Sequence, residues 1–130
     1  MLQILPPLAY AGALVAILMT ARGRSIAPAL RWGVPAGLGV LFTLFSLWTV
    51  AEEGLVQFWI NHTTTMAGVQ VWFDLVLAVA IAFVLIAPRA RAAGMPLLPW
   101  GIAVIATACI ALLFMLARLL WLDERATRRP

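Results

Sequence analysis

Four long apolar runs occupy most of this 130-residue chain, at about residues 2–20, 32–51, 69–87 and 97–122. Each run has about the length that a helix needs to cross a hydrocarbon layer of about 30 Å at 1.5 Å per residue. The connections between the runs are too short to form a separate domain. We therefore predict a single-domain, all-α integral membrane bundle of four antiparallel transmembrane helices, with a short polar tail at 123–130.

The composition supports a chain that lives mostly in lipid. Hydrophobic residues make up 65% and charged residues 11% of the sequence, whereas soluble domains have roughly 45–50% and about 25%. The net charge of +4 comes from nine arginines, which lie near the edges of the apolar runs. This placement is typical of contacts with lipid headgroups, so we expect the lipid bilayer as a partner and no nucleic acid.

The arginines also predict an orientation, because cytoplasmic loops are enriched in basic residues. With four crossings, one side of the membrane would hold five arginines and the other four. The five are Arg22, Arg24, Arg31, Arg89 and Arg91, and the four are Arg118, Arg125, Arg128 and Arg129. The second loop, 52–68, has none. We predict a multi-pass protein with the first and third loops in the cytoplasm and both termini outside, with dual topology as the alternative.

Tryptophans mark the ends of the predicted spans. Indole has an apolar body and one N–H group, so it favours the headgroup boundary. Five of the six lie near ends of the runs, and the sixth lies in the second loop. The predicted anchors are Trp32, Trp48, Trp59, Trp72, Trp100 and Trp121.

The second loop contains a short amphipathic pattern at 54–62. Its larger apolar side chains and His62 repeat at three and four residues, which predicts an interfacial helix anchored by Trp59. Such a helix is either a lid or docking surface, or a loop that rests its apolar side chains on lipid.

Two charged side chains fall inside the predicted spans. Asp74 lies about 7 Å inside the third run at 1.5 Å per residue, and Arg118 lies near the far end of the fourth. A charge at the bilayer centre costs ~2.5–3.5 kcal/mol on insertion scales, and less near the interface. Antiparallel third and fourth spans would bring the two together, so we predict an ion pair that fixes helix register. Alternatively, Asp74 lines a proton or ion path with an outer polar cluster of Glu52, Glu53 and His62.

Small residues recur at four-residue spacing in three of the spans, and the fourth run contributes Ala103, Thr107 and Ala111. Gly33 and Gly37 form one pair, and Ala78 and Ala82 form another. Such spacing lets helix backbones approach closely within a membrane. We predict that these residues pack helices inside the monomer, with dimerisation as the alternative.

No recognisable catalytic set is present. The single cysteine, Cys109, makes no internal disulfide and no CxxC motif, and lone His62 does not make a metal site. There is no histidine pair, nucleophile triad or phosphate-binding glycine loop. We therefore predict no enzyme activity, no cofactor and no metal.

Three short motifs resemble a family of small bacterial inner-membrane proteins of unknown function. They are Trp72-Phe73-Asp74-Leu75, the arginine-rich turn from Pro88 to Met95, and Leu116-Ala117-Arg118. Members of that family have three spans, so this chain differs by its additional first span. The resemblance implies a bacterial inner membrane and an important Asp74, but it implies no activity.

Two functions are compatible with these features. The scarcity of polar groups within the spans favours a non-catalytic accessory or structural subunit of a larger bacterial membrane complex. The alternative is a small oligomeric transporter of ions, protons or a solute that uses Asp74.

Overall fold

The computed structural model describes residues 2–23 and 28–128, and this part of the chain contains helices and short connections but no strand. The helices are η1 (Leu2–Ile4), α1 (Leu5–Ala21), α2 (Pro28–Glu53), α3 (Leu55–Thr63), α4 (Met66–Ala92), α5 (Leu97–Thr107) and α6 (Cys109–Thr127). The predicted all-α fold is confirmed. Among the described helices, two segments are both long and apolar enough to cross a membrane: Leu30–Glu53 in α2 and Met66–Ala92 in α4. The shorter α1 and α5 are also apolar.

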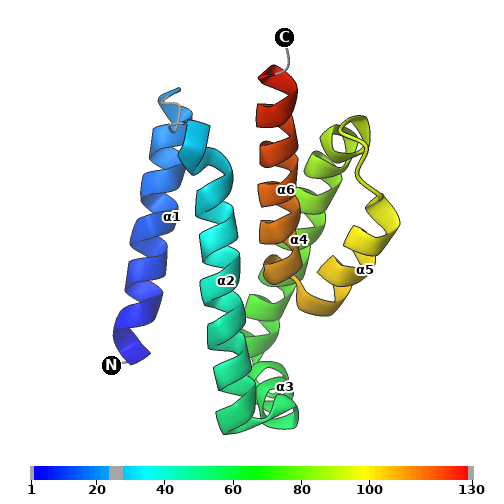
Figure 1. Cartoon of the computed structure of the whole chain (residues 1–130). Coiled ribbons are helices and arrows are strands. Elements are labelled where there is room, and N and C mark those ends of the chain that lie inside the picture. The colour runs from blue at the N-terminus through cyan, green and yellow to red at the C-terminus, as the bar shows by residue number, and fades with distance from the viewer. Residues whose placement is uncertain (1, 24–27, 129–130) are drawn as a thin grey trace.

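The helices run back and forth between two ends of the molecule (Figure 1). α1 leads to one end, α2 returns to the other, and α3 lies there before α4 runs back. α5 then descends only part of the way, and α6 turns and rises again to the C-terminus. We call the end with α3 the α3 end. We call the opposite end, where α1, α4 and α6 finish, the basic end.

The fourth apolar run is therefore not one helix, and the prediction of a single span at 97–122 is wrong. The chain breaks at Ala108, whose φ of 47° and ψ of −115° lie outside the helical region. The Thr107 hydroxyl donates to the Ala103 carbonyl at 2.9 Å and accepts from the Ala111 N–H at 3.2 Å. Thr107 thus satisfies one of the N–H groups that the break leaves without a helical partner. The result is a helical hairpin, α5–α6.

The turn between α4 and α5 is made by backbone hydrogen bonds. Met95 N–H donates to the Ala90 carbonyl at 2.9 Å, and Gly94 N–H donates to the Arg91 carbonyl at 3.0 Å. Gly94 has a φ of 77°, which a glycine adopts without steric cost. This arrangement is typical of a helix C-terminus that ends in a glycine, and it sends α5 back alongside α4.

The core lies around the hairpin. One buried cluster, in the half of the molecule toward the basic end, consists of Ala90, Met95, Met115 and Leu119. A second cluster, at the hairpin tip, consists of Val79, Val104 and Ala111. α6 also packs along α2, and a Cβ placed on Gly39 would lie 3.1 Å from the ring of Phe114. The glycine at position 39 therefore allows the close approach of α2 and α6.

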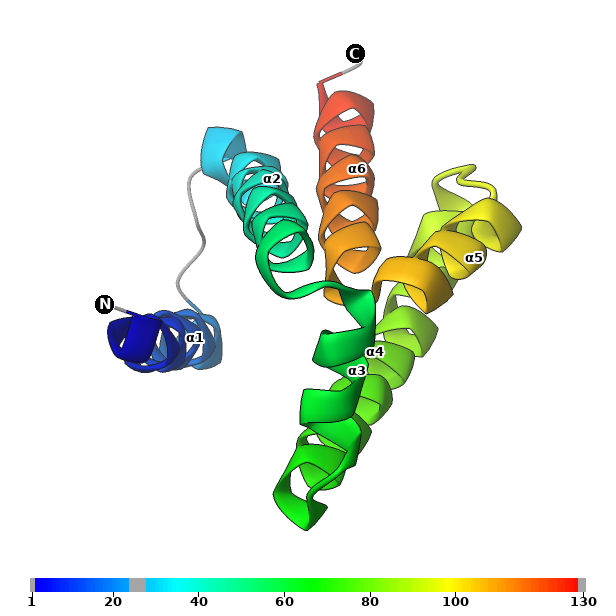
Figure 2. The ribbon, with the colours of Figure 1, turned by 90° about the horizontal axis from the view of Figure 1, so that it is seen from below.

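α1 stands apart from the rest of the structure. Among the described elements it packs only against the preceding turn η1, and none of its residues is buried. Figure 2 shows α1 separated from the group formed by α2 to α6, with α3 lying along α4. The packed unit therefore consists of α2, α3, α4 and the hairpin.

Candidate functional site

A cavity of about 910 Å³ lies between α2, α3, α4 and the tip of the hairpin. It exists because the hairpin does not reach the α3 end. α5 has 11 residues, or about 16 Å of helix, whereas α4 has 27 residues, or about 40 Å. Beyond the hairpin tip, no further described helix fills the space between α2 and α4.

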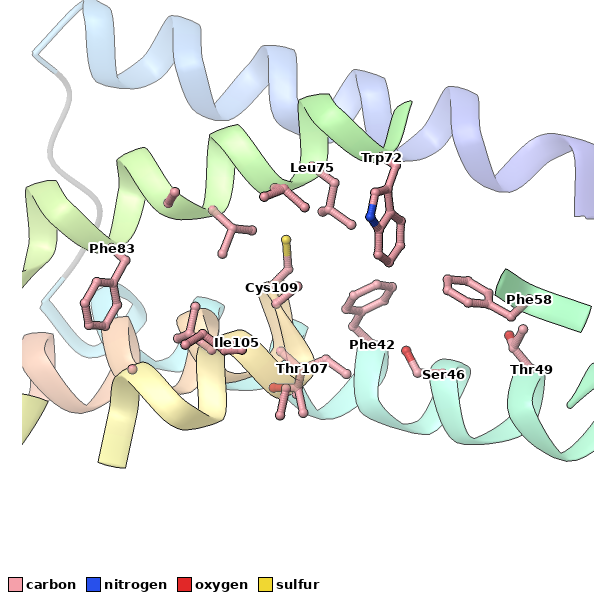
Figure 3. Close-up of a pocket in the computed structure, with 18 of the residues that line it drawn as sticks. Phe42, Ser46, Thr49, Phe58, Trp72, Leu75, Phe83, Ile105, Thr107 and Cys109 are labelled. Atoms are coloured by element: carbon pink, nitrogen blue, oxygen red, sulfur yellow. The ribbon is translucent and has the colours of Figure 1, made fainter. Parts of the chain in front are cut away.

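The cavity wall is almost entirely apolar and aromatic, and no charged side chain of the described residues lines it. Figure 3 shows side chains from α2, α3, α4 and the hairpin converging on it. The labelled residues are Phe42, Ser46, Thr49, Phe58, Trp72, Leu75, Phe83, Ile105, Thr107 and Cys109. The sequence did not predict this cavity, because its position depends on where the hairpin turns.

A few polar groups face the cavity. Ser46 and Trp72 point into it (Figure 3), and neither side chain makes a hydrogen bond with a described residue. The Cys109 thiol points from the hairpin tip toward α4. Among the described residues, the cavity lining has hydroxyl, indole and thiol groups but no carboxylate or imidazole, so the cavity is suited to an apolar group.

The predicted ion pair between Asp74 and Arg118 is not formed. Asp74 lies near the α3 end of α4, whereas Arg118 lies in the half of α6 toward the basic end. The prediction assumed a continuous fourth helix, and the reversal at Ala108 carries Arg118 to the opposite end. Arg118 instead stacks on Trp121, with its guanidinium carbon 4.4 Å from the ring centroid. Arg125 covers the same indole at 3.6 Å.

A different ion pair joins the hairpin to α4. Arg89 Nη2 lies 2.7 Å from Asp123 Oδ2, and both side chains are substantially exposed. A second pair, Arg128 with Glu124, lies within α6. The sequence reasoning missed the first pair because it assigned Asp123 to a polar tail beyond the fourth span.

Asp74 itself is exposed and makes no hydrogen bond or ion pair with any described residue. It does not line the cavity, which lies against another face of α4. The structure therefore gives Asp74 no position on an internal path.

The members of the predicted outer polar cluster, Glu52, Glu53 and His62, make no hydrogen bond or ion pair with one another in the described structure. Glu52 accepts a hydrogen bond from Trp48 Nε1 at 3.3 Å, within α2. His62 Nδ1 donates to the Phe58 carbonyl at 2.8 Å, within α3, and its ring lies 4.5 Å from the Phe58 ring. Glu53 is exposed at the end of α2. The described residues contain no group of three histidine, cysteine or acidic side chains placed to hold a metal.

A helix at 55–63 lies within a residue of the predicted 54–62 at each end. Its aromatic residues pack against α4, with the Trp59 and Trp72 ring centroids 5.7 Å apart and those of Phe58 and Trp72 6.3 Å apart. α3 is therefore fixed to α4 and covers one end of the cavity, to which Leu55 and Phe58 contribute.

The remaining predicted anchors differ in their exposure. Trp32, Trp48 and Trp59 are exposed, as expected for side chains that meet a headgroup boundary. Trp100 is half-buried against the core cluster of the hairpin, and Trp121 is half-buried beneath two arginines.

Most of the residues predicted to pack helices together do not lie at a close contact between helices. A Cβ on Gly33 or Gly37 would meet no atom within 4 Å, so these glycines do not bring helices together inside the monomer. Ala78 is exposed and Ala82 is half-buried. The close contact in α2 is made by Gly39, two residues beyond the predicted pair and therefore on another side of the helix.

Charge is separated along the molecule. Every described arginine lies in the half toward the basic end: Arg22, Arg31, Arg89, Arg91, Arg118, Arg125 and Arg128. At the α3 end the described charged side chains are acidic, namely Glu52, Glu53 and Asp74. Arg24 and Arg129 lie outside the described residues.

Comparison with known proteins adds no relative: no family model, no curated protein and no solved structure matches this chain.

Proposed function

We propose that this chain is a non-catalytic integral protein of the bacterial inner membrane, with three crossing helices and one hairpin that enters the membrane and returns. The crossing helices are α1, α2 and α4, and the hairpin is α5–α6. The lengths of its two arms support this arrangement. The ten residue steps from Ala108 to Arg118 cover about 15 Å, and α5 covers about 16 Å, so the tip reaches the middle of a layer about 30 Å thick.

The observation that carries the proposal is the gathering of the described arginines at one end. Four crossings would divide the nine arginines five against four, which gives almost no orientation signal. With the hairpin, the described arginines fall on one side and the opposite side has none. Because positive charge marks the cytoplasmic side, the basic end lies in the cytoplasm and the N-terminus outside. This proposal replaces the sequence-based topology in which both termini are outside.

The position of the cavity is consistent with a hairpin tip inside a membrane. Irregular backbone at membrane depth is tolerated where protein surrounds it or where it lines a cavity that admits water. The backbone N–H groups of Cys109 and Ile110, at the start of α6, donate no hydrogen bond to a described residue. Both residues line the cavity.

Within the membrane we propose an accessory role, in which the chain packs against a larger membrane protein. Two features support this role over transport. Among the described elements, α1 contacts only the short turn η1 that precedes it, and it is apolar all round. Asp74, on which the transport alternative depends, lies outside the cavity, and the cavity wall has no charged side chain among the described residues. The described structure therefore favours the accessory role over transport.

Reporter fusions test the orientation. Green fluorescent protein after residue 130 is expected to fluoresce, because it folds in the cytoplasm, and alkaline phosphatase at that position is expected to be inactive. Phosphatase fused before residue 1, behind an exported leader, is expected to be active. An active phosphatase at the C-terminus would contradict the hairpin topology.

Native mass spectrometry tests the accessory role. The tagged protein is extracted gently from its own host's membrane, after alkaline carbonate washing shows that it is integral. The accessory role predicts a stoichiometric complex with a larger membrane protein. Recovery of the monomer or a homodimer alone, from membranes that retain their other complexes, would contradict it.

A further inference from the structure

One face of α4 carries an acidic side chain without a partner. Asp74 lies on this face together with Gln70 and Ala78, at spacings of four residues, and all three are exposed. Ile81 continues the face and is 59% exposed. The opposite face of α4 borders the cavity and the hairpin. The Asp74 face is therefore directed away from the packed unit.

The depth of Asp74 can be judged from the position of Arg89. If Arg89 marks the cytoplasmic boundary, a 30 Å layer extends about twenty residues back along α4, to near Val69. Asp74 then lies five residues, or about 7 Å, inside the opposite boundary. Acidic side chains at such depth normally face a bundle interior or pair with another group. Asp74 does neither within the described structure.

Charge complementarity indicates what pairs with it. None of the described arginines lies in the half of the protein that contains Asp74, and the sequence has no lysine. His62 lies in that half, but its Nδ1 and ring already contact Phe58 in its own helix. A second copy in the same orientation would bring another carboxylate, not a cation. A basic side chain of a different protein would supply the complementary charge that the described residues do not.

We propose that the α4 face formed by Gln70, Asp74, Ala78 and Ile81 docks a transmembrane helix of a different protein, which carries a lysine or arginine in its outer third. This inference rests on the proposed membrane orientation and names the chemistry of the partner. Ala78 allows the helix to approach closely, and Gln70 adds an amide hydrogen bond next to the ion pair.

Photo-crosslinking in the host membrane tests the proposal. A benzoylphenylalanine is placed at Ile81 on the Asp74 face or, as the matched control, at Phe73. Phe73 is 62% exposed and lies about 100° around the helix from Asp74. We expect one protein adduct from position 81, at least fivefold more abundant than from position 73. The crosslinked peptide should belong to a transmembrane segment with a basic residue in its outer third.

Substitutions at Asp74 establish whether its negative charge is responsible for docking the partner helix. Asp74→Leu should reduce the adduct at least fivefold, while Asp74→Glu retains it. Asp74→Arg, combined with aspartate at the partner's basic position, should restore the adduct. An adduct only with lipid or a second copy, or one that Asp74→Leu leaves unchanged, would overturn the docking proposal. Release of the chain by carbonate would instead overturn the proposed membrane function.

Discussion

The third and fourth apolar runs have similar hydropathy but fold differently. The third forms α4, one helix of 27 residues, whereas the fourth divides at Ala108 into α5 and α6. The two arrangements place the charged residues near the end of the fourth run at different ends of the molecule. The fourth run contains Arg118 and is followed by Asp123 and Arg125, which a crossing helix would carry to the α3 end. The hairpin instead keeps these charges beside the other arginines. Apolar length alone therefore does not establish that a segment crosses.

The two regions also differ in packing. α4 exposes large apolar side chains along most of its length, while α6 contains the buried residues Ala111, Met115, Ala117 and Leu119. α4 is thus the helix that faces outward and α6 the helix that holds the packed unit together. Substitutions in the two helices should separate these roles.

The largest effect is expected at Met115. Its side chain is fully buried, so Met115→Ala removes packing contacts and should lower the free energy of unfolding by about 2–4 kcal/mol. The matched change in α4, Val84→Ala, alters a side chain that is 66% exposed and should have an effect within about 0.5 kcal/mol. Unfolding titrations in detergent micelles measure both. Equal losses of unfolding free energy would contradict the view that α6 is buried and α4 faces outward.

The next largest effect is expected at the break itself. Ala108 has a positive φ, which glycine adopts freely and a β-branched residue adopts only with strain. Ala108→Gly should therefore stabilise the protein by about 1 kcal/mol, and Ala108→Val should destabilise it by about 1–3 kcal/mol. A continuous helix would give the opposite order, because glycine is the poorer helix former. The same unfolding titrations decide between a break at Ala108 and a continuous helix.

The smallest effect is expected at the ion pair between α4 and the hairpin. Asp123→Asn removes the charge that faces Arg89 across 2.7 Å, but both side chains are largely exposed. Exposed pairs contribute roughly 0.2–1 kcal/mol, and salt screens them. We therefore expect a loss of less than about 1 kcal/mol that shrinks further at high salt. A loss of several kcal/mol would mean that the pair is shielded from solvent.

The sequence predicted the helical class and most helix positions. Apolar length located α1, α2 and α4, and the three- and four-residue spacing around Trp59 located α3. The break at Ala108 carried no such signal, because neither glycine nor proline lies at Thr107-Ala108-Cys109. Its hydrogen bonds come from Thr107, a residue that is also common within continuous helices.

The other errors result from that break or from helix rotation. The Asp74–Arg118 pair required a fourth span, and the cavity depends on where the hairpin ends. The close contact in α2 uses Gly39 instead of Gly33 and Gly37. At 100° per residue, Gly39 lies about 200° around the helix from Gly37. Spacing identifies a stripe of small residues, but only the packed structure shows which face is in contact.

The central claim is that the fourth apolar run turns back on itself, and an intramolecular distance tests it directly. Spin labels are placed at Leu98 and Ala126, both exposed, after Cys109→Ala removes the native thiol. A continuous helix would place these positions about 42 Å apart, at 1.5 Å per residue. The hairpin places both toward the basic end, so pulsed electron paramagnetic resonance in lipid nanodiscs should give a distance well below that value. A distribution centred near 42 Å would show that the run crosses the membrane and would contradict the hairpin.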